Sequence, residues 1–290
     1  MGEKYQGMLV NGKRMGHGTC EYLLTGDFYE GEWKGDFRHG KGTMHYADGS
    51  IFEGEWAEDN RVDGHMQYAN KDDFVGKFAN DDRADGTYTY AAGDVYVGKW
   101  SYRARVGEAV CTYIGGDVYE GQWAADRRNG NGRLTFASGD VYEGKHKEDD
   151  LQGMGIMKFK NGDDYEGLWD HNLRNGHGGQ VYGNGDKYNG NWSRHVLNGF
   201  GTQHMANGDI YVGEFCQNKR NGTGILTTEA GVRYEGLFAD DVKSGQGTEY
   251  YVNGDRFQGC WLANEREPKG CWTHQYRQRL EASGGGIAGF

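Results

Sequence analysis

The sequence is poor in proline, cysteine and long apolar runs, and each scarcity excludes a class of protein. With Pro 1 in 290 residues it is not a proline-rich linker, and its 52 glycines do not form the Gly-x-y triplets of collagen. The five cysteines, Cys20, Cys111, Cys216, Cys260 and Cys271, include no Cys-x-x-Cys pair, so we expect neither a disulfide framework nor a zinc site. No apolar stretch is long enough for a signal peptide or a membrane-spanning helix. These features together favour a cytoplasmic protein.

Positive charge is also scarce. Lys and Arg total 32 against 43 Asp and Glu, which gives a net charge of -11, and no cluster of four or more basic residues occurs. Nucleic-acid binders and proteins that dock on anionic lipid both need basic clusters, so we expect no nucleic-acid partner, and the charge disfavours membrane lipid. Aromatic residues, in contrast, make up 14% of the chain, which favours a folded protein over a disordered one.

A period of about 23 residues runs through the chain. An aromatic residue followed two positions later by glycine recurs at spacings of 24, 23, 22, 22 and then 23 seven times. The twelve aromatic residues are Tyr5, Tyr29, Phe52, Phe74, Tyr96, Tyr119, Tyr142, Tyr165, Tyr188, Tyr211, Tyr234 and Phe257. The glycines of the second to eleventh repeats are Gly31, Gly54, Gly76, Gly98, Gly121, Gly144, Gly167, Gly190, Gly213 and Gly236. Regular self-similarity of this kind indicates a repeat architecture.

Alternation within each repeat predicts a β-hairpin. Tyr119, Gly121 and Trp123 are two residues apart, so they share one face of a strand, and a Gly-x-Gly strand follows after a loop expected at 124–129. The turn into the next repeat is expected at 137–140, where Gly139 supplies a positive φ. Glycine weakens a strand unless something packs closely over its backbone, so we expect each aromatic ring to lie over a glycine of the adjoining strand.

These residues resemble the MORN repeat (membrane occupation and recognition nexus), whose pattern is Tyr-x-Gly-x-Trp, a short loop, Gly-x-Gly and Asn-Gly-Asp. The resemblance covers about residues 4–274. It implies an all-β fold, an elongated and twisted antiparallel sheet of about twelve stacked hairpins. Residues 275–290 are expected to form a C-terminal cap, with a short helix at Tyr276–Ala282, and a glycine-rich tail.

The repeat pattern is interrupted in a few places. The third and fourth repeats have 22 residues, which we interpret as a loop shortened by one residue, and Val62, Ala84 and Ala109 replace pattern glycines. Either these changes are tolerated drift, or residues 62–109 form a bend or a partner-specific surface. His146 stands at a Trp position, and Pro268 replaces a glycine of the last repeat, where proline would suit a terminal strand.

No pattern in the chain predicts catalysis. The Gly-x-Gly pairs match neither the dinucleotide-binding nor the P-loop motif, and there is no His-x-x-x-His pair. The carboxylates recur once per repeat at turns, as expected of structural residues. We therefore predict no enzyme activity, no catalytic residue, no cofactor and no metal.

The resemblance implies a protein-interaction scaffold of a cytoskeletal assembly, either at the cell cortex or in the axoneme or radial spokes of a cilium or flagellum. A partner helix or peptide is expected on the aromatic face. The residues predicted to bind it are Trp33, Trp56, Phe78, Trp100, Tyr119, Trp123, Tyr142, Trp169, Trp192 and Phe215. Homodimers are a further expectation because an open sheet has unpaired edges. The alternative is an anionic-lipid-binding or membrane-tethering module.

Overall fold

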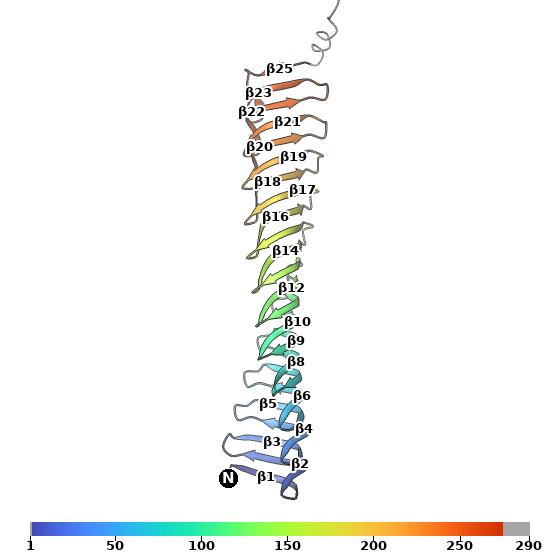
Figure 1. The fold of residues 1–290 in the computed structure, drawn as a ribbon, viewed down its shortest axis with the longest axis vertical. Coiled ribbons are helices and arrows are strands. Elements are labelled where there is room, and N and C mark those ends of the chain that lie inside the picture. The colour runs from blue at the N-terminus through green and yellow to red at the C-terminus, as the bar shows by residue number, and fades with distance from the viewer. Residues whose placement is uncertain (1, 275–290) are drawn as a thin grey trace, which may run out of the picture. The chain divides into compact units, whose positions relative to one another are not determined.

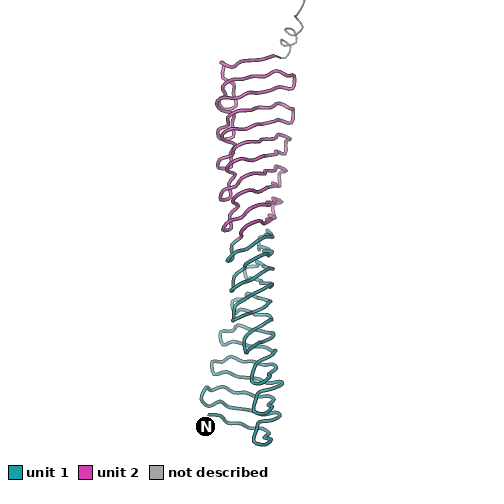
Figure 2. The backbone as a smooth tube through the Cα atoms, viewed as in Figure 1, with its two compact units in different colours: residues 1–150 teal, residues 151–290 magenta. Residues whose placement is uncertain are grey.

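The computed structural model describes residues 2–274, which form twenty-five β-strands and no helix (Figure 1). The chain divides into two compact units, Met1–Asp150 and Leu151–Phe290 (Figure 2). The helix expected at 276–282 and the glycine-rich tail lie outside the described residues. Within each unit, successive strands up to β23 pair antiparallel, and β24 and β25 both pair with β23, so the predicted all-β fold of antiparallel hairpins is confirmed.

The first unit contains thirteen strands that succeed one another as hairpins. They are β1 (Glu3–Val10), β2 (Lys13–Tyr22), β3 (Asp27–Lys34), β4 (Phe37–His45), β5 (Ile51–Ala57), β6 (Asn60–Gln67), β7 (Asp73–Ala79), β8 (Asp82–Thr89), β9 (Val95–Ser101), β10 (Ala104–Thr112), β11 (Val118–Ala124), β12 (Arg127–Thr135) and β13 (Val141–Lys147).

The second unit continues the same hairpin order. Its strands are β14 (Asp150–Lys158), which begins at the boundary, β15 (Asp164–Asp170), β16 (Leu173–Val181), β17 (Lys187–Ser193), β18 (Val196–His204), β19 (Ile210–Cys216), β20 (Lys219–Thr227), β21 (Arg233–Ala239), β22 (Val242–Tyr250), β23 (Arg256–Leu262), β24 (Glu265–Arg266) and β25 (Cys271–Thr273).

Two kinds of turn connect the strands. The turn after each aromatic strand has two residues with positive φ, such as Ala125 at 48° and Asp126 at 67°. The loop expected at 124–129 is therefore wrong, because β12 already begins at Arg127. The turn between repeats follows the prediction, since Gly139 has a φ of 95° and its N–H donates to the Phe136 carbonyl at 2.9 Å.

The 22-residue repeats keep this two-residue turn, so the expectation of a shortened loop is also wrong. In a 23-residue repeat, Trp33 pairs with Arg38 and Gly31 with Gly42, which leaves a wide bulge in β4. The corresponding bulge in β6 is one residue shorter. The missing residue is thus taken from the bulge in the strand.

The core of each unit is a column of aromatic rings. The ring of Tyr29 lies between Trp33 and Trp56, with centroid distances of 5.1 and 5.5 Å and edge-to-face geometry. Tyr188 repeats this arrangement between Trp192 and Phe215. Each such pair adds about 0.5–1.5 kcal/mol beyond the burial of area. A hairpin therefore gains stability from the next hairpin, as expected of a repeat array.

The glycines give the tyrosine rings room. A Cβ atom at Gly31 would lie 2.5 Å from the Tyr29 hydroxyl and 2.5 Å from the Cα of Gly42. A Cβ at Gly42 would lie 2.6 Å from Cε2 of the same ring. The expectation that a ring lies over the glycine of the adjoining strand is confirmed for these tyrosines, and it explains why glycine is retained inside a strand.

Pro268 lies between the two short strands β24 and β25, as the sequence position suggested. Trp272 of β25 packs against Phe257 at 5.3 Å and stacks on Tyr251 at 5.7 Å. The guanidinium of Arg266 lies 4.8 Å from the Trp272 ring. Aromatic and cationic side chains of the last described repeat therefore pack against one another at the end of the second unit.

Candidate protein-binding site

The ten aromatic residues predicted to bind a partner lie in the interior of the two units. Their exposed fractions range from 0% for Tyr119 and Tyr142 to 7% for Phe78 and Trp100, and the others are Trp33, Trp56, Trp123, Trp169, Trp192 and Phe215. Within each unit the structure does bring them onto one face, but a buried ring offers no contact area to a partner. This assignment is corrected: the rings form the core, and an accessible site must be sought in the side chains around them.

Arginines cover much of the aromatic column in the first unit. The guanidinium of Arg38, on β4, lies 4.3 Å from the centroid of Trp56 in the next repeat. Its Nε lies 3.0 Å from Oδ1 of Asp59, its Nη2 donates to the Asp59 carbonyl at 3.0 Å, and its backbone N–H donates to Oδ1 at 2.8 Å. Each arginine thus joins two hairpins by a cation–π contact and by an ion pair with a turn.

Six repeats contain this arginine–aspartate pair, with Nε to Oδ1 distances from 2.7 to 3.5 Å. The pairs are Arg14–Asp36, Arg38–Asp59, Arg61–Asp81, Arg105–Asp126, Arg128–Asp149 and Arg220–Asp241. Reasoning from the sequence missed them. The available signal is that, in six repeats, an arginine stands shortly after the two-residue turn and is followed 20 to 22 residues later by an aspartate.

In the first unit, a tyrosine lies near each of the arginines from Arg38 to Arg128 that contact the aromatic column. In the first unit, five half-buried tyrosines occupy the end of the Gly-x-Gly hairpin arm. Desolvation by burial raises the pKa of Tyr22 to about 12 and also raises the pKa of Tyr46, Tyr68 and Tyr90, against the opposing charge of the neighbouring arginine. These hydroxyls therefore stay protonated donors at neutral pH.

We call these residues the Tyr–Arg row. It comprises Tyr22, Tyr46, Tyr68, Tyr90 and Tyr113 with Arg38, Arg61, Arg83, Arg105 and Arg128.

A hollow of about 390 Å³ opens on the Tyr–Arg row. Tyr46, Tyr68, Arg61, Arg83 and Arg103 contribute to its lining. Asp48, Asp81 and Asp82 supply carboxylates at the same hollow. The site is thus mixed in charge and aromatic in character, and it lies within residues 62–109, where the repeat pattern is irregular, and the residues just before them.

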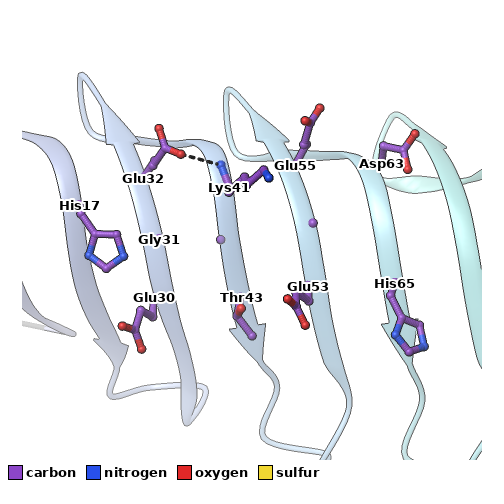
Figure 3. A pocket seen from close by; sticks show the side chains of 12 residues that line it. His17, Glu30, Gly31, Glu32, Lys41, Thr43, Glu53, Glu55, Asp63 and His65 are labelled. Atoms are coloured by element: carbon purple, nitrogen blue, oxygen red, sulfur yellow. Dashed lines mark hydrogen bonds between the residues drawn. The ribbon is translucent and has the colours of Figure 1, made fainter.

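The opposite face of the first unit has a different character. A hollow of about 710 Å³ crosses β2 to β6, over the backbone of Gly31, Gly42 and Gly54 (Figure 3). Its carboxylates stand in two rows on either side of these glycines, with Lys41 and two histidines among them (Figure 3). The acidic residues are Glu30, Glu32, Glu53, Glu55 and Asp63, and all are exposed. This open surface is acidic and solvated.

Within residues 2–274, no group of three or more His, Cys, Asp or Glu side chains is placed to hold a metal ion. The described part of the chain also contains no helix that is long and apolar enough to cross a membrane.

Comparisons with known proteins identify the repeat. A family model described as MORN repeat matches more than half of the chain, at residues 5–22, 29–51, 119–141, 142–164, 165–187, 188–210, 211–233 and 234–256. The matched segments leave out residues 52–118, which include the irregular repeats. No curated protein matches the sequence significantly.

Two similarities among solved structures are weak. One is to the TCP10 domain of Danio rerio CPAP in complex with a peptide of Danio rerio STIL, at 11% identity and a TM-score of 0.38, covering 85% of this chain and 97% of that chain. Another is to the TCP domain of SAS-4 (dCPAP) of Drosophila melanogaster in complex with a proline-rich motif of Ana2, at 13% identity, a TM-score of 0.32 and coverages of 61% and 85%. TM-scores this low carry no argument about function. The family match does establish membership, and the chain belongs to the MORN-repeat family.

Proposed function

We propose that the protein is a non-catalytic scaffold that binds a segment of a protein partner along the Tyr–Arg row of its first unit. The observation that carries this proposal is the row itself, in which half-buried tyrosines alternate with arginines that are held in place. Tyrosine and arginine are the residue types, with tryptophan, that dominate the binding energy of protein interfaces. The row replaces, as the proposed binding surface, the buried rings that the sequence alone indicated.

Pre-organisation supports the same site. Binding orders side chains at a cost of about 0.5–1.5 kcal/mol for each flexible residue. In the row, Arg61 is fixed by Asp81, with Nε 2.7 Å from Oδ1, and Arg105 is fixed by Asp126 at 3.3 Å. Their side chains are 14% and 19% exposed, so much of this cost is met when the array folds. The Tyr–Arg row is therefore a rigid surface before a partner binds.

The repeat spacing defines what fits on the row. Two strands about 4.8 Å apart give a repeat of about 10 Å, and an extended segment rises about 3.3 Å per residue. An extended partner therefore places about three residues on each repeat. Because five tyrosines span four intervals, a segment of about twelve residues covers the row.

We further propose that the partner belongs to a cytoskeletal assembly, in the axoneme or at the cell cortex. The support for this placement is the resemblance to MORN proteins of such assemblies. The lipid-binding alternative gains no support from the exposed carboxylates on the opposite face, which repel anionic headgroups. Flotation with phosphatidylserine liposomes tests it, and salt-sensitive binding would favour the lipid alternative.

The test compares two matched double variants in proximity labelling and pull-down from cells. Tyr46→Ser with Tyr90→Ser changes the row, and Phe159→Ser with Tyr182→Ser changes the same repeat position in the second unit, where the side chains are also half-buried. Both variants are first checked for folding by circular dichroism and thermal unfolding. We expect the first variant to lose a defined set of partners that the second retains. Retention of all partners by a folded first variant would contradict the proposal.

A further inference from the structure

The turn between β9 and β10 lacks a hydrogen bond that the comparable turns of the described residues form. The second residue of the two-residue turn accepts a hydrogen bond from a backbone N–H of the preceding repeat, as Asp59 accepts from Arg38 at 2.8 Å. The acceptors are Asp36, Asp59, Asp81, Asp126, Asp149, Asn172, His195, Asn218, Asp241 and Asn264. In the turn between β9 and β10 this position is Arg103, with a φ of 67°. The side chain of arginine carries no acceptor atom.

The residue left without its acceptor is Arg83. Its backbone N–H turns to Oδ1 of the adjacent Asp82 at 3.0 Å. Arg103 lies 3.6 Å from Oδ2 of the same carboxylate, so Asp82 serves both residues. Among the described residues, no carboxylate forms an ion pair with the guanidinium of Arg83, whereas Arg61 and Arg105 on either side each have one.

The guanidinium of Arg83 is nevertheless positioned like its neighbours. It lies 4.3 Å from the centroid of Trp100 and 4.7 Å from that of Tyr88. Stacking of this kind fixes the plane of the group and the direction of its N–H donors. Arg83 and Arg103 both line the 390 Å³ hollow, and the side chain of Arg103 is 83% exposed.

Charge pairing distinguishes this hollow from the repeats that contain the arginine–aspartate pair. In the six repeats with an arginine–aspartate pair, one arginine faces one turn carboxylate. Here Arg83 and Arg103 share Asp82, Asp81 pairs with Arg61, and Asp48 accepts from the Ser50 N–H at 2.8 Å, so no carboxylate of the hollow pairs with the guanidinium of Arg83. The nearby Asp72 is already engaged, because it accepts from the Tyr88 hydroxyl at 2.6 Å and from the Ala91 N–H at 2.7 Å.

We propose that the hollow between Arg83 and Arg103 is a carboxylate-binding subsite. An Asp or Glu side chain of a protein partner occupies the place that the turn carboxylate holds in the regular repeats. The guanidinium of Arg83 donates to it as Arg38 donates to Asp59, and Arg103 covers it from the turn. This inference rests on the proposed function and adds that the partner segment is acidic at this position.

The decisive variant is Arg103→Asp, which restores the regular turn. Because the new carboxylate fills the subsite from within, we expect the thermal midpoint to stay the same or rise while binding of an external carboxylate falls. Loss of charge-assisted hydrogen bonds of this kind corresponds to about a 10- to 100-fold weaker affinity. Arg194→Asp is the matched control, because it makes the same change of charge at an exposed residue of a two-residue turn in the second unit.

The probe is a fluorescein-labelled hexaglutamate peptide, measured by anisotropy, with unlabelled peptide titrated into ¹⁵N-labelled protein to follow the arginine Nε–Hε signals. We expect the signals of Arg83 and Arg103 to shift while those of Arg61 and Arg105 stay in place. The Arg194→Asp variant is expected to bind as the wild type does. Equal binding by the wild type and Arg103→Asp would overturn the subsite, and so would an equal loss in both variants, which indicates bulk charge only.

The partner captured by pull-down separates this inference from the proposed function. If Tyr46→Ser with Tyr90→Ser loses the partner and Arg103→Asp binds it as tightly as the wild type, the scaffold proposal stands and the subsite is refuted. If Arg103→Asp alone weakens binding and Arg194→Asp does not, both are supported.

Discussion

Replacing His146 by phenylalanine is expected to remove a pH dependence of stability that originates in the core. His146 occupies a Trp position, is 2% exposed, and has no hydrogen-bond partner for either ring nitrogen. Its ring packs edge-to-face against Tyr119 at 4.9 Å and Tyr142 at 5.2 Å. Desolvation, with a smaller contribution from the charge of Arg128, lowers its pKa from 6.5 to about 4. The ring is therefore neutral in the folded protein at neutral pH.

The magnitude follows from the difference between the two states. Below pH 6.5 the His146 ring is protonated in the unfolded chain, whereas in the folded chain it stays neutral down to about pH 4. Stability due to this group is thus present at neutral pH and is lost as the pH falls through this window. From pH 7 to pH 5 the loss amounts to about 2 kcal/mol in the free energy of unfolding. Phenylalanine cannot be protonated and leaves no polar atom unsatisfied.

Urea unfolding at pH 7 and pH 5, followed by tryptophan fluorescence, measures this effect. The wild type is expected to lose about 2 kcal/mol more than His146→Phe between the two pH values. His204→Phe is the control, because it makes the same substitution at a histidine that is exposed instead of buried. An identical pH dependence in the wild type and His146→Phe would refute the reasoning.

Three further changes test the packing. Gly132→Ala places a Cβ 2.5 Å from a tyrosine ring carbon and is expected to cost about 1–3 kcal/mol in urea unfolding, whereas Gly115→Ala, with no atom within 4 Å, costs little. Trp192→Phe loses an indole hydrogen bond of 3.0 Å, while Trp123→Phe removes a buried donor that has no partner, so the first variant should be less stable by about 1–2 kcal/mol in the same assay. Asp126→Asn keeps the side-chain oxygen that accepts from the Arg105 backbone N–H but loses the ion pair with the Arg105 guanidinium. Calorimetry should show a free energy of unfolding that is lower by about 0.5–1 kcal/mol, and this difference should shrink at high salt.

Residues in the 124–129 segment show where the local pattern fails to predict structure. The two-residue turn at Ala125 and Asp126 lacks the Asn-Gly or Gly-Gly signature of such turns. Positive φ at residues other than glycine costs roughly 1–2 kcal/mol each. The carboxylate of Asp126 bonds to the preceding repeat through Arg105, which helps to offset that cost. The stabilising partner is one repeat away, so the segment itself gives no sign of the turn.

The sequence by itself determined the repeat, the strand alternation and the place of the glycines. Tyr119, Gly121 and Trp123 share a face because neighbouring side chains on a strand alternate, and a pattern repeated twelve times leaves only one consistent hairpin register. Only the tertiary structure decided which face is accessible. Trp56 is buried because Arg38, which belongs to the previous hairpin, lies over it, and Arg83 lacks its carboxylate only because stacking aligns it with Arg103. Burial and ion pairing depend on distances between repeats, which exist only after the hairpins have stacked.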